Sequence, residues 1–396
     1  MPTQSEHTSS WSIQPESPLH QQMRQWRHDF HAHPETAFEE HRTAAKVAEL
    51  LKSFGIEVHT GLAKTGVVGV LDGNISSDRC IGLRADMDAL NLQELNQFKH
   101  CSTHQGKMHG CGHDGHTAML LGAACYLAEH RDFAGRVVFI FQPAEEGENG
   151  AEVMCQDGLF DLFPVDAIYG IHNWPGVPTG SFAIHQTAVM ASMDVFDIEI
   201  TGRGSHGAMP HAGVDPVVVA GQLITSLQSI VGRSLDPQKA SVVSITQMQG
   251  GDAYNVIPES VTLSGTCRTF CAETQDKIEH RMQQHVEHIC EAYGATGKLN
   301  YRRISPATIN QPEHANICIN TALSLVSTEQ VITDLQPSMA SEDFSFMLQR
   351  KPGAYFWLGN GNHEQSKGLH NPYYDFNDEI LPLGASFWIA LAKLNN

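Results

Sequence analysis

One short segment of the chain concentrates side chains that could bind a metal ion. It spans residues 108–116 and has the sequence MHGCGHDGH. Cys111 and His113 flank a single glycine, which lets the backbone bend so that both side chains face one point. A thiolate and an imidazole are good ligands for zinc and similar ions. Taken alone, the segment also fits a loop with a free cysteine and with Asp114 capping a helix.

Two adjacent carboxylates, Glu145 and Glu146, follow an apolar run and a proline. Such pairs are common on solvated surfaces, but at a buried edge two like charges are costly unless a positive group compensates them. A metal ion would compensate them. One carboxylate would then bind the ion while its neighbour takes a proton from water, whose pKa a metal lowers to about 7. The pair therefore contains a candidate metal ligand and a candidate general base.

His172 and His370 are two further candidate groups. His172 directly follows a short apolar run, and His370 ends a loop that follows another apolar run. The runs predicted to be buried strands are 66–71, 80–83, 136–141, 167–171 and 354–358. Helices are expected at 21–30, 40–54, 116–130, 315–325 and 380–394. This alternation is typical of an α/β fold with a mostly parallel mixed sheet and flanking helices. Ligand sites in such sheets lie beyond the carboxyl ends of the strands.

The middle of the chain has a different pattern. Strands are expected at 193–201, 241–248, 261–270 and 298–303, and helices at 215–231 and 274–293. The order β-α-β-β-α-β is typical of a ferredoxin-like, one-sided antiparallel sheet. We therefore expect a small domain over 190–305, inserted into a larger domain formed by 1–189 and 306–396.

Composition excludes several classes of partner. The chain has 396 residues, with 44 Asp and Glu against 25 Lys and Arg, and a formal net charge of −19. This balance disfavours binding to nucleic acid or to an anionic membrane surface. No apolar run approaches the roughly 20 residues of a membrane span, and the N-terminal residues lack the features of a secretory signal. Nine cysteines without a regular spacing indicate reduced thiols, so a cytoplasmic protein is expected.

Further motifs extend from about Leu19 to the end of the chain. They are His31–Glu35, LRADMDAL at 83–90, MHGCGHDGHTAMLLGAA at 108–124, FQPAEEG at 141–147, GIHNWP at 170–175, GRGSHGAMPH at 202–211, NVIP at 255–258, GTCRTF at 265–270, SEDF at 341–344 and LHNPYYDFND at 369–378. Together they resemble the dinuclear-metal amidohydrolases related to aminoacylase and carboxypeptidase G. The resemblance is greatest to the branch with hippurate hydrolase, N-acyl-amino-acid amidohydrolases and plant indoleacetyl-amino-acid hydrolases.

The resemblance implies two divalent metal ions per subunit, with zinc, manganese, nickel and cobalt all compatible with the donor set. The implied ligands are Cys111, His113, Glu146, His172 and His370. Five ligands cannot fill two tetrahedral shells without sharing, so a bridging ligand and a bridging water are expected. Glu145 is the implied general base. Distant relatives have a histidine at the position of Asp86, and here Cys111 is expected to replace that ligand, while Asp88 orients a ligand from outside the metal shell.

The inserted domain is implied to form a homodimer or higher homo-oligomer and to act as a lid. His206 would reach the partner's active site and stabilise the tetrahedral oxyanion, with help from Asn255. Arg268 would receive the substrate carboxylate. The alternatives are a flexible turn around His206 and an ordinary surface position for Arg268.

Other histidines have lesser expected roles. His109, His116 and His211 are assigned supporting or structural roles. The histidines expected to be solvated are His7, His20, His280, His285 and His288.

The activity implied by the resemblance is hydrolysis of N-acyl-L-amino acids, either hippurate-like or N-acetylated, to a carboxylic acid and a free amino acid. A dipeptidase or carboxypeptidase of the same family is an alternative, since it needs only a changed acyl or amine pocket. A non-catalytic metal-binding homologue is the alternative from another class. Glu145 discriminates between them, because a protein without catalysis would have little reason to keep both carboxylates.

Overall fold

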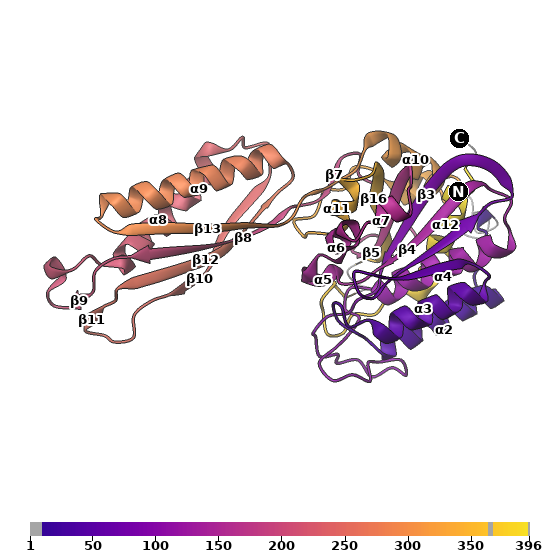
Figure 1. Ribbon diagram of the computed structural model, residues 1–396, viewed down its shortest axis with the longest axis horizontal. Coiled ribbons are helices and arrows are strands. Elements are labelled where there is room, and N and C mark those ends of the chain that lie inside the picture. The colour runs from indigo at the N-terminus through magenta and orange to yellow at the C-terminus, as the bar shows by residue number, and fades with distance from the viewer. Residues whose placement is uncertain (1–9, 363–366, 395–396) are drawn as a thin grey trace. The chain divides into compact units, whose positions relative to one another are not determined.

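The computed structural model describes residues 10–362 and 367–394 of the chain, and His7 lies outside this part. The chain divides into two compact units (Figure 1). The larger unit comprises Met1–Val189, Ile309–Gln336 and Asp343–Asn396, and the smaller comprises Met190–Thr308 and Pro337–Glu342. Among the described residues, no helix is both long and apolar enough to cross a lipid bilayer.

The larger unit is built on one eight-stranded sheet. Its strands, in spatial order, are β1 (Glu57–Leu62), β2 (Gly66–Asp72), β4 (Ala134–Gln142), β3 (Ile75–Asp86), β5 (Ala167–Pro175), β16 (Gly353–Gly361), β6 (Phe182–Ala183) and β15 (Val331–Ile332). The four central strands β4, β3, β5 and β16 run parallel, whereas β1 and β2 pair antiparallel with each other, β2 with β4, and β6 with β16. The last strand, β15, runs parallel to β6. The expected α/β class with a mostly parallel sheet is confirmed.

Helices cover both faces of this sheet. They are α2 (Pro18–Ala32), α3 (His41–Ser53), α4 (His113–Glu129), α5 (Glu145–Glu148), α6 (Gly150–Gln156), α7 (Leu159–Leu162), α10 (Pro312–Leu323), α11 (Phe344–Leu348) and α12 (Leu381–Ala392). The main core lies between the sheet and a layer that includes α2, α4 and α12, which pack side by side. On the other face, α6 and α11 contact β4, β5 and β16. α4 is apolar almost all round because it is buried beneath its neighbours.

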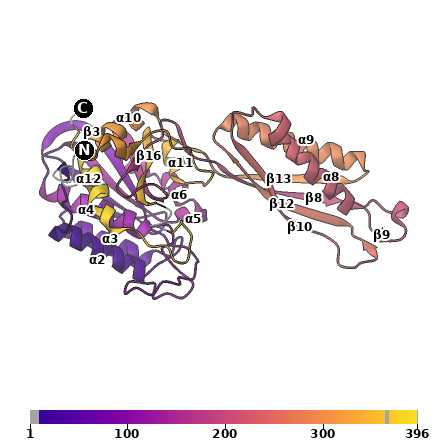
Figure 2. The same cartoon turned by 180° about the vertical axis from the view of Figure 1, so that it is seen from behind.

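The smaller unit has the expected β-α-β-β-α-β order. Its main elements are β8 (Met193–Thr201), α8 (Pro216–Ser229), β10 (Ser241–Gln249), β12 (Ser260–Thr269), α9 (Ala272–Ala292) and β13 (Thr296–Ser305). The antiparallel sheet has the order β10-β12-β8-β13, and α8 and α9 lie together on one of its faces (Figure 2). Alternate residues of β8 and β12, including Phe196 and Leu263, form the core beneath these helices. A short ribbon, β9 (Ser205–His206) with β11 (Val256–Ile257), is added to this frame. A second short pair joins β7 (Ala188–Met190) to β14 (Thr308–Ile309).

Two local expectations were wrong, and one strand was not predicted. The run at 167–171 does not end before His172, because β5 stays paired with β16 as far as Pro175, opposite Gly361. The polar edge strand β1 has no apolar alternation and was missed, as is common for edge strands with solvated side chains. His20 is buried rather than solvated, because its ring nitrogens contact Glu16 N at 2.9 Å and Asp378 O at 3.0 Å.

Candidate metal centre

A tight turn places Cys111 and His113 side by side at the start of α4. Gly112 between them has φ +98°, and a Cβ at this position would lie 2.1 Å from Asn173 Oδ1. Only glycine fits this conformation and this close approach. Both flanking side chains are buried, and Cys111 Sγ lies 3.4 Å from His172 Nε2.

His172 reaches the same point from β5. Its Nδ1 lies 2.6 Å from the carbonyl oxygen of Asn173, so the Nδ1–H donates there. This hydrogen bond leaves the Nε2 lone pair directed toward Cys111, which is the tautomer that a metal ligand requires. Burial and the neighbouring His116 hold the pKa of His172 well below its ordinary value, so the ring is neutral.

A strained turn after β4 delivers Glu145 and Glu146. Ala144 adopts a left-handed conformation with φ +56°, which is costly for a residue with a Cβ. Two buried carboxylates fix this turn: Glu40 accepts a hydrogen bond from Ala144 N at 2.9 Å, and Asp88 accepts one from Glu146 N at 2.9 Å. The backbone conformation thus determines where both glutamates point.

His370 comes from the segment that follows β16. Its backbone N–H donates to the carbonyl of Gly110 at 2.8 Å, which ties this segment to the Cys111 turn. Its Nε2 lies 3.2 Å from Glu146 Oε1, and its side chain is 55% exposed. His370 is therefore the proposed ligand with the most open surroundings.

These side chains form overlapping groups that could hold metal ions. Within each group, the candidate ligand atoms lie within 4.8 Å of one another. The groups are Cys111 with His113 and His172, Cys111 with Glu146 and His370, and His113 with Glu145 and Glu146. All five predicted ligands and the predicted base are included, and the shared members permit two adjacent ions.

Two buried atoms in the middle of the cluster show that a cation fits there. His113 Nε2 makes no hydrogen bond within the described chain and lies 4.0 Å from Glu146 Oε1, whose nearest ion-pair partner is His370 Nε2 at 3.2 Å. A buried polar atom without a hydrogen-bond partner is costly, and a bound cation would replace the proton on His113 Nε2 and contact Glu146 Oε1 as well. The mixture of one thiol, three imidazoles and carboxylates suits a transition metal.

The electrostatics of the cluster also favour a cation. Burial raises the pKa of the Cys111 thiol well above its usual range, and the nearby Glu146 and Glu145 raise it further. Burial lowers the pKa of His113, but the charges of Asp86 and Asp88 outweigh burial and raise it to about 10. Both groups hold a proton when no metal is bound, so metal binding would release protons.

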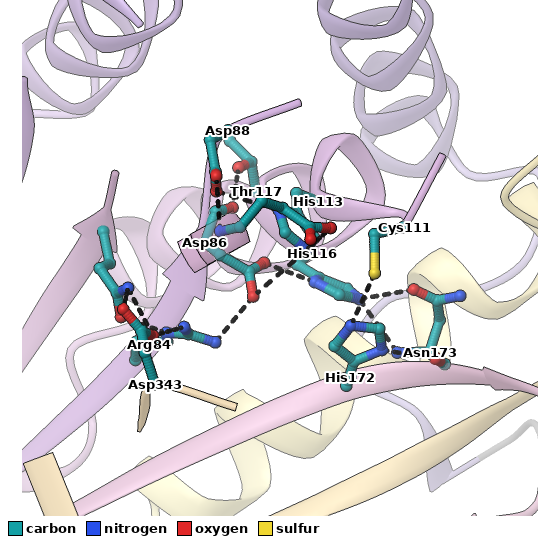
Figure 3. A network of polar contacts seen from close by, with 12 residues as sticks. Arg84, Asp86, Asp88, Cys111, His113, His116, Thr117, His172, Asn173 and Asp343 are labelled. Carbon is teal, nitrogen blue, oxygen red and sulfur yellow. Dashed lines mark hydrogen bonds and ion pairs between the residues drawn. The ribbon is translucent and has the colours of Figure 1, made fainter. Parts of the chain in front are cut away.

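A second layer of buried polar groups supports the proposed ligands (Figure 3). Asp88 Oδ1 lies 3.2 Å from His113 Nδ1, so that His113 donates through Nδ1 and Nε2 is the nitrogen that can bind a metal once its proton is released. Asp86 contacts His116 Nδ1 at 2.6 Å and Arg84 Nη1 at 2.7 Å. The other nitrogen of His116 contacts Asn173. Asp86 and His116 are near His113, but their atoms are already paired, and this favours the interpretation that neither binds metal.

The sequence analysis missed one support of this layer. Arg84 is fully buried and contacts Asp343 at 3.1 Å, Asp86 at 2.7 Å and Gln142 at 2.7 Å (Figure 3). Asp343 also accepts a hydrogen bond from Ala151 N at 2.9 Å. Arg84 and Asp343 lie in the motifs at 83–90 and 341–344, but nothing in the sequence showed that they form a pair.

The remaining predicted residues lie in the smaller unit, in two separate places. His206 on β9 and Asn255 next to β11 are brought together, because Val256 pairs with His206 and Gly207 N donates to Asn255 O at 2.7 Å. Both side chains are exposed. Arg268 is half-buried near the opposite end of the sheet, where its Nη1 donates to Thr266 Oγ1 and Cys267 O.

Comparison with known proteins adds an independent result. Residues 82–394 match the model of peptidase family M20/M25/M40. The chain is 43% identical over 367 residues to the hippurate hydrolase of Campylobacter jejuni, covering 92% of this chain and 94% of that protein. It is 36% identical to a thermostable carboxypeptidase of Saccharolobus solfataricus (94% and 95% covered) and to an N-acetyl-L-cysteine deacetylase of Bacillus subtilis (94% and 88%).

A solved structure agrees with this match. It is a Bacillus subtilis protein described as a dinuclear metal-binding peptidase of family M20. Its TM-score is 0.83 at 33% identity, with 94% of this chain and 97% of that chain covered.

Proposed function

Because this chain belongs to peptidase family M20/M25/M40, we propose that it is a two-metal amidohydrolase that cleaves N-acyl-L-amino acids. The observation that carries the proposal is the cluster of overlapping ligand groups around His113 and Glu146, with Glu145 at its edge. Two relatives support this proposal, since a hippurate hydrolase and an N-acetyl-L-cysteine deacetylase both hydrolyse such compounds.

Two divalent ions would be held by Cys111, His113, Glu146, His172 and His370. When bound, such ions polarise an acyl carbonyl and lower the pKa of water to about 7. The chain's contribution is to fix the ligands in place, through the Gly112 turn, the Asp88 bridge and the His172 tautomer.

Glu145 would act as the general base and then as the general acid. It follows Ala144, whose fixed backbone directs it toward the same cluster, and its carboxylate is grouped with the imidazole of His113 and the carboxylate of Glu146. It would accept a proton from the attacking water and return that proton to the nitrogen of the departing amino acid.

The smaller unit would supply the oxyanion donor and the carboxylate anchor from two different subunits. Ser260, next to the β9–β11 ribbon, and Arg268 are eight residues apart on β12, or about 26 Å at the rise of a strand. This span is several times the length of a small N-acyl amino acid. His206 and Arg268 of one chain therefore cannot hold the same substrate molecule, and a homodimer that exchanges His206 resolves the difficulty.

The decisive test is Glu145→Gln. We expect kcat for N-benzoylglycine to fall on the order of 100- to 10,000-fold while the metal content is unchanged, because the amide keeps the shape but cannot accept a proton. Glu148→Gln, an exposed change in the same short helix, is the matched control and should keep full activity. Hydrolysis that survives in Glu145→Gln would exclude this mechanism.

Substrate class and the shared site need separate measurements. A panel of N-acyl amino acids and unblocked dipeptides distinguishes the amidohydrolase from a dipeptidase or carboxypeptidase. Mixing His206→Ala chains with Glu145→Gln chains should restore about one quarter of full activity, because half of random dimers are hybrids with one complete site. No recovery in verified hybrids would show that His206 acts within its own chain.

A further inference from the structure

The smaller unit ends in an exposed apolar surface that its own fold does not use. We call it the tip, and it consists of residues 206–212 and 250–256, which the β9–β11 pairing holds together. Every residue of both segments is exposed. In a chain of net charge −19, the tip carries a single charged residue, Asp252.

Three large side chains of the tip stand in solvent around His206. Tyr254 is fully exposed, Val256 is 54% exposed and Met209 is 49% exposed. Exposed apolar residues that are clustered, rather than scattered singly, mark surfaces that bind something. Tyrosine in particular supplies a large contact area at low entropic cost, and it is enriched at the centres of interfaces.

Resting on the proposed function, we infer that the tip of one chain completes the acyl pocket of a second copy, with Tyr254 as the side chain that contacts the acyl group. His206 and Asn255 belong to the same tip, and Tyr254 is the direct neighbour of Asn255. Whatever brings His206 to a substrate carbonyl also brings Tyr254 to it. The occupant of this surface is therefore the active site of another copy of this chain.

The covalent structure of the substrate indicates which of its ends the tip contacts, namely the acyl group. The acyl substituent is bonded directly to the carbonyl carbon whose oxygen His206 would hold. The carboxylate lies farther along the molecule and is assigned to Arg268, which is remote from the tip. The apolar side chains of the tip therefore meet the acyl group, and they favour a large apolar or aromatic one over acetyl.

The test compares N-benzoylglycine with N-acetylglycine in the metal-loaded enzyme. Tyr254→Ala should lower kcat/KM for N-benzoylglycine about tenfold and change that for N-acetylglycine about twofold or less. Tyr254→Phe should retain most of the benzoyl activity, because the contact uses the ring face. Tyr293→Ala removes another exposed tyrosine of the same unit, 46% exposed at the end of α9, and should leave both substrates unchanged.

Hybrid dimers test whether Tyr254 acts in the partner's site. Chains carrying different affinity tags allow the hybrids to be purified. In a hybrid of the natural chain with a Glu145→Gln, Tyr254→Ala chain, the single live site receives the altered tip and should show the reduced benzoyl preference. In a hybrid of Tyr254→Ala with Glu145→Gln, the live site receives a natural tip and should keep the full preference.

The opposite pattern in the hybrids, or an equal effect of Tyr254→Ala on both substrates, would overturn the inference. A Tyr254→Ala enzyme with natural kinetics would overturn it as well. We expect Tyr254→Ala to fold, because a fully exposed side chain contributes little to stability. A thermal unfolding temperature equal to that of the natural chain would confirm this. Failure of the proposed function is seen separately, as activity that persists in Glu145→Gln homodimers.

Discussion

Asp88→Asn tests the metal centre without relying on catalysis. Asp88 is 1% exposed, and its two oxygens serve two proposed ligands, His113 Nδ1 at 3.2 Å and the backbone of Glu146 at 2.9 Å. Loss of one such supporting contact typically costs 10- to 100-fold in metal affinity. Because Asp88 supports two ligands at once, we expect a loss near 100-fold, or about 2.8 kcal/mol.

The direction of the hydrogen bonds explains why asparagine is a severe replacement. Its single oxygen can still accept from Glu146 N, but its amide N–H₂ would then face His113 Nδ1. His113 would have to accept at Nδ1 and carry its proton on Nε2, the atom proposed to bind metal. Asp88→Ala, which imposes no tautomer, should therefore bind metal no more weakly than Asp88→Asn.

The measurement is the affinity for Zn²⁺ by competition with a chelator, together with thermal unfolding of the metal-free proteins. Asp72→Asn, an exposed carboxylate at the end of β2 paired with Arg136, is the control and should bind zinc as the natural chain does. If folded Asp88→Asn bound zinc within twofold of the natural chain, the assignment of His113 Nε2 as a ligand would be refuted.

Two pH-dependent predictions concern buried groups near the site. Burial lowers the pKa of His31, but contacts with Asp114 and Glu94 outweigh burial and raise it to about 9. Protonated His31 therefore contributes about 3 kcal/mol to the free energy of unfolding. This contribution is fully present below pH 6.5 and is lost as the pH rises through 9. His31→Gln should therefore lose this slope in denaturant unfolding between pH 6.5 and 9; an unchanged slope would contradict the pairing. Burial raises the pKa of Glu40 to about 7, despite its hydrogen bond from Thr65, so ionisation costs the native state about 3 kcal/mol above pH 7. Glu40→Gln should be more stable than the natural chain by this amount at pH 8 and by roughly half of it at pH 5.5; equal gains at both pH values would show that the effect is not ionisation.

Much of the architecture could be read from local patterns. The β8 strand was predicted at its exact bounds, because Phe196, Ile198 and Ile200 alternate with polar residues over one core. Alternation of apolar and polar residues reflects burial of one face of a strand, so it can be recognised without knowing which strands pair with it. The same applies to the Cys111–Gly112–His113 turn, in which the ligands and the glycine that allows their approach are neighbours in sequence.

Other features depend on contacts between distant residues. The Arg84–Asp343 pair spans 259 positions, and the burial of His20 depends on the carbonyl of Asp378, 358 positions away. A charged residue or a histidine has the same local sequence signal whether it is solvated or buried with a partner. No spacing rule therefore reveals such pairs.

The sequence by itself determined the inventory of this protein: an α/β sheet, an inserted β-α-β-β-α-β unit, and thiol, imidazole and carboxylate groups near strand ends. Only the tertiary structure decided how they combine. It showed which nitrogen of His113 lacks a hydrogen-bond partner, that Asp88 contacts two proposed ligands at once, and that His206 lies on the short β9–β11 ribbon whereas Arg268 lies on β12 of the four-stranded sheet. The physical reason is that side-chain types follow from the local code, whereas distances, tautomers and unpaired atoms arise only when strands far apart in the chain pair.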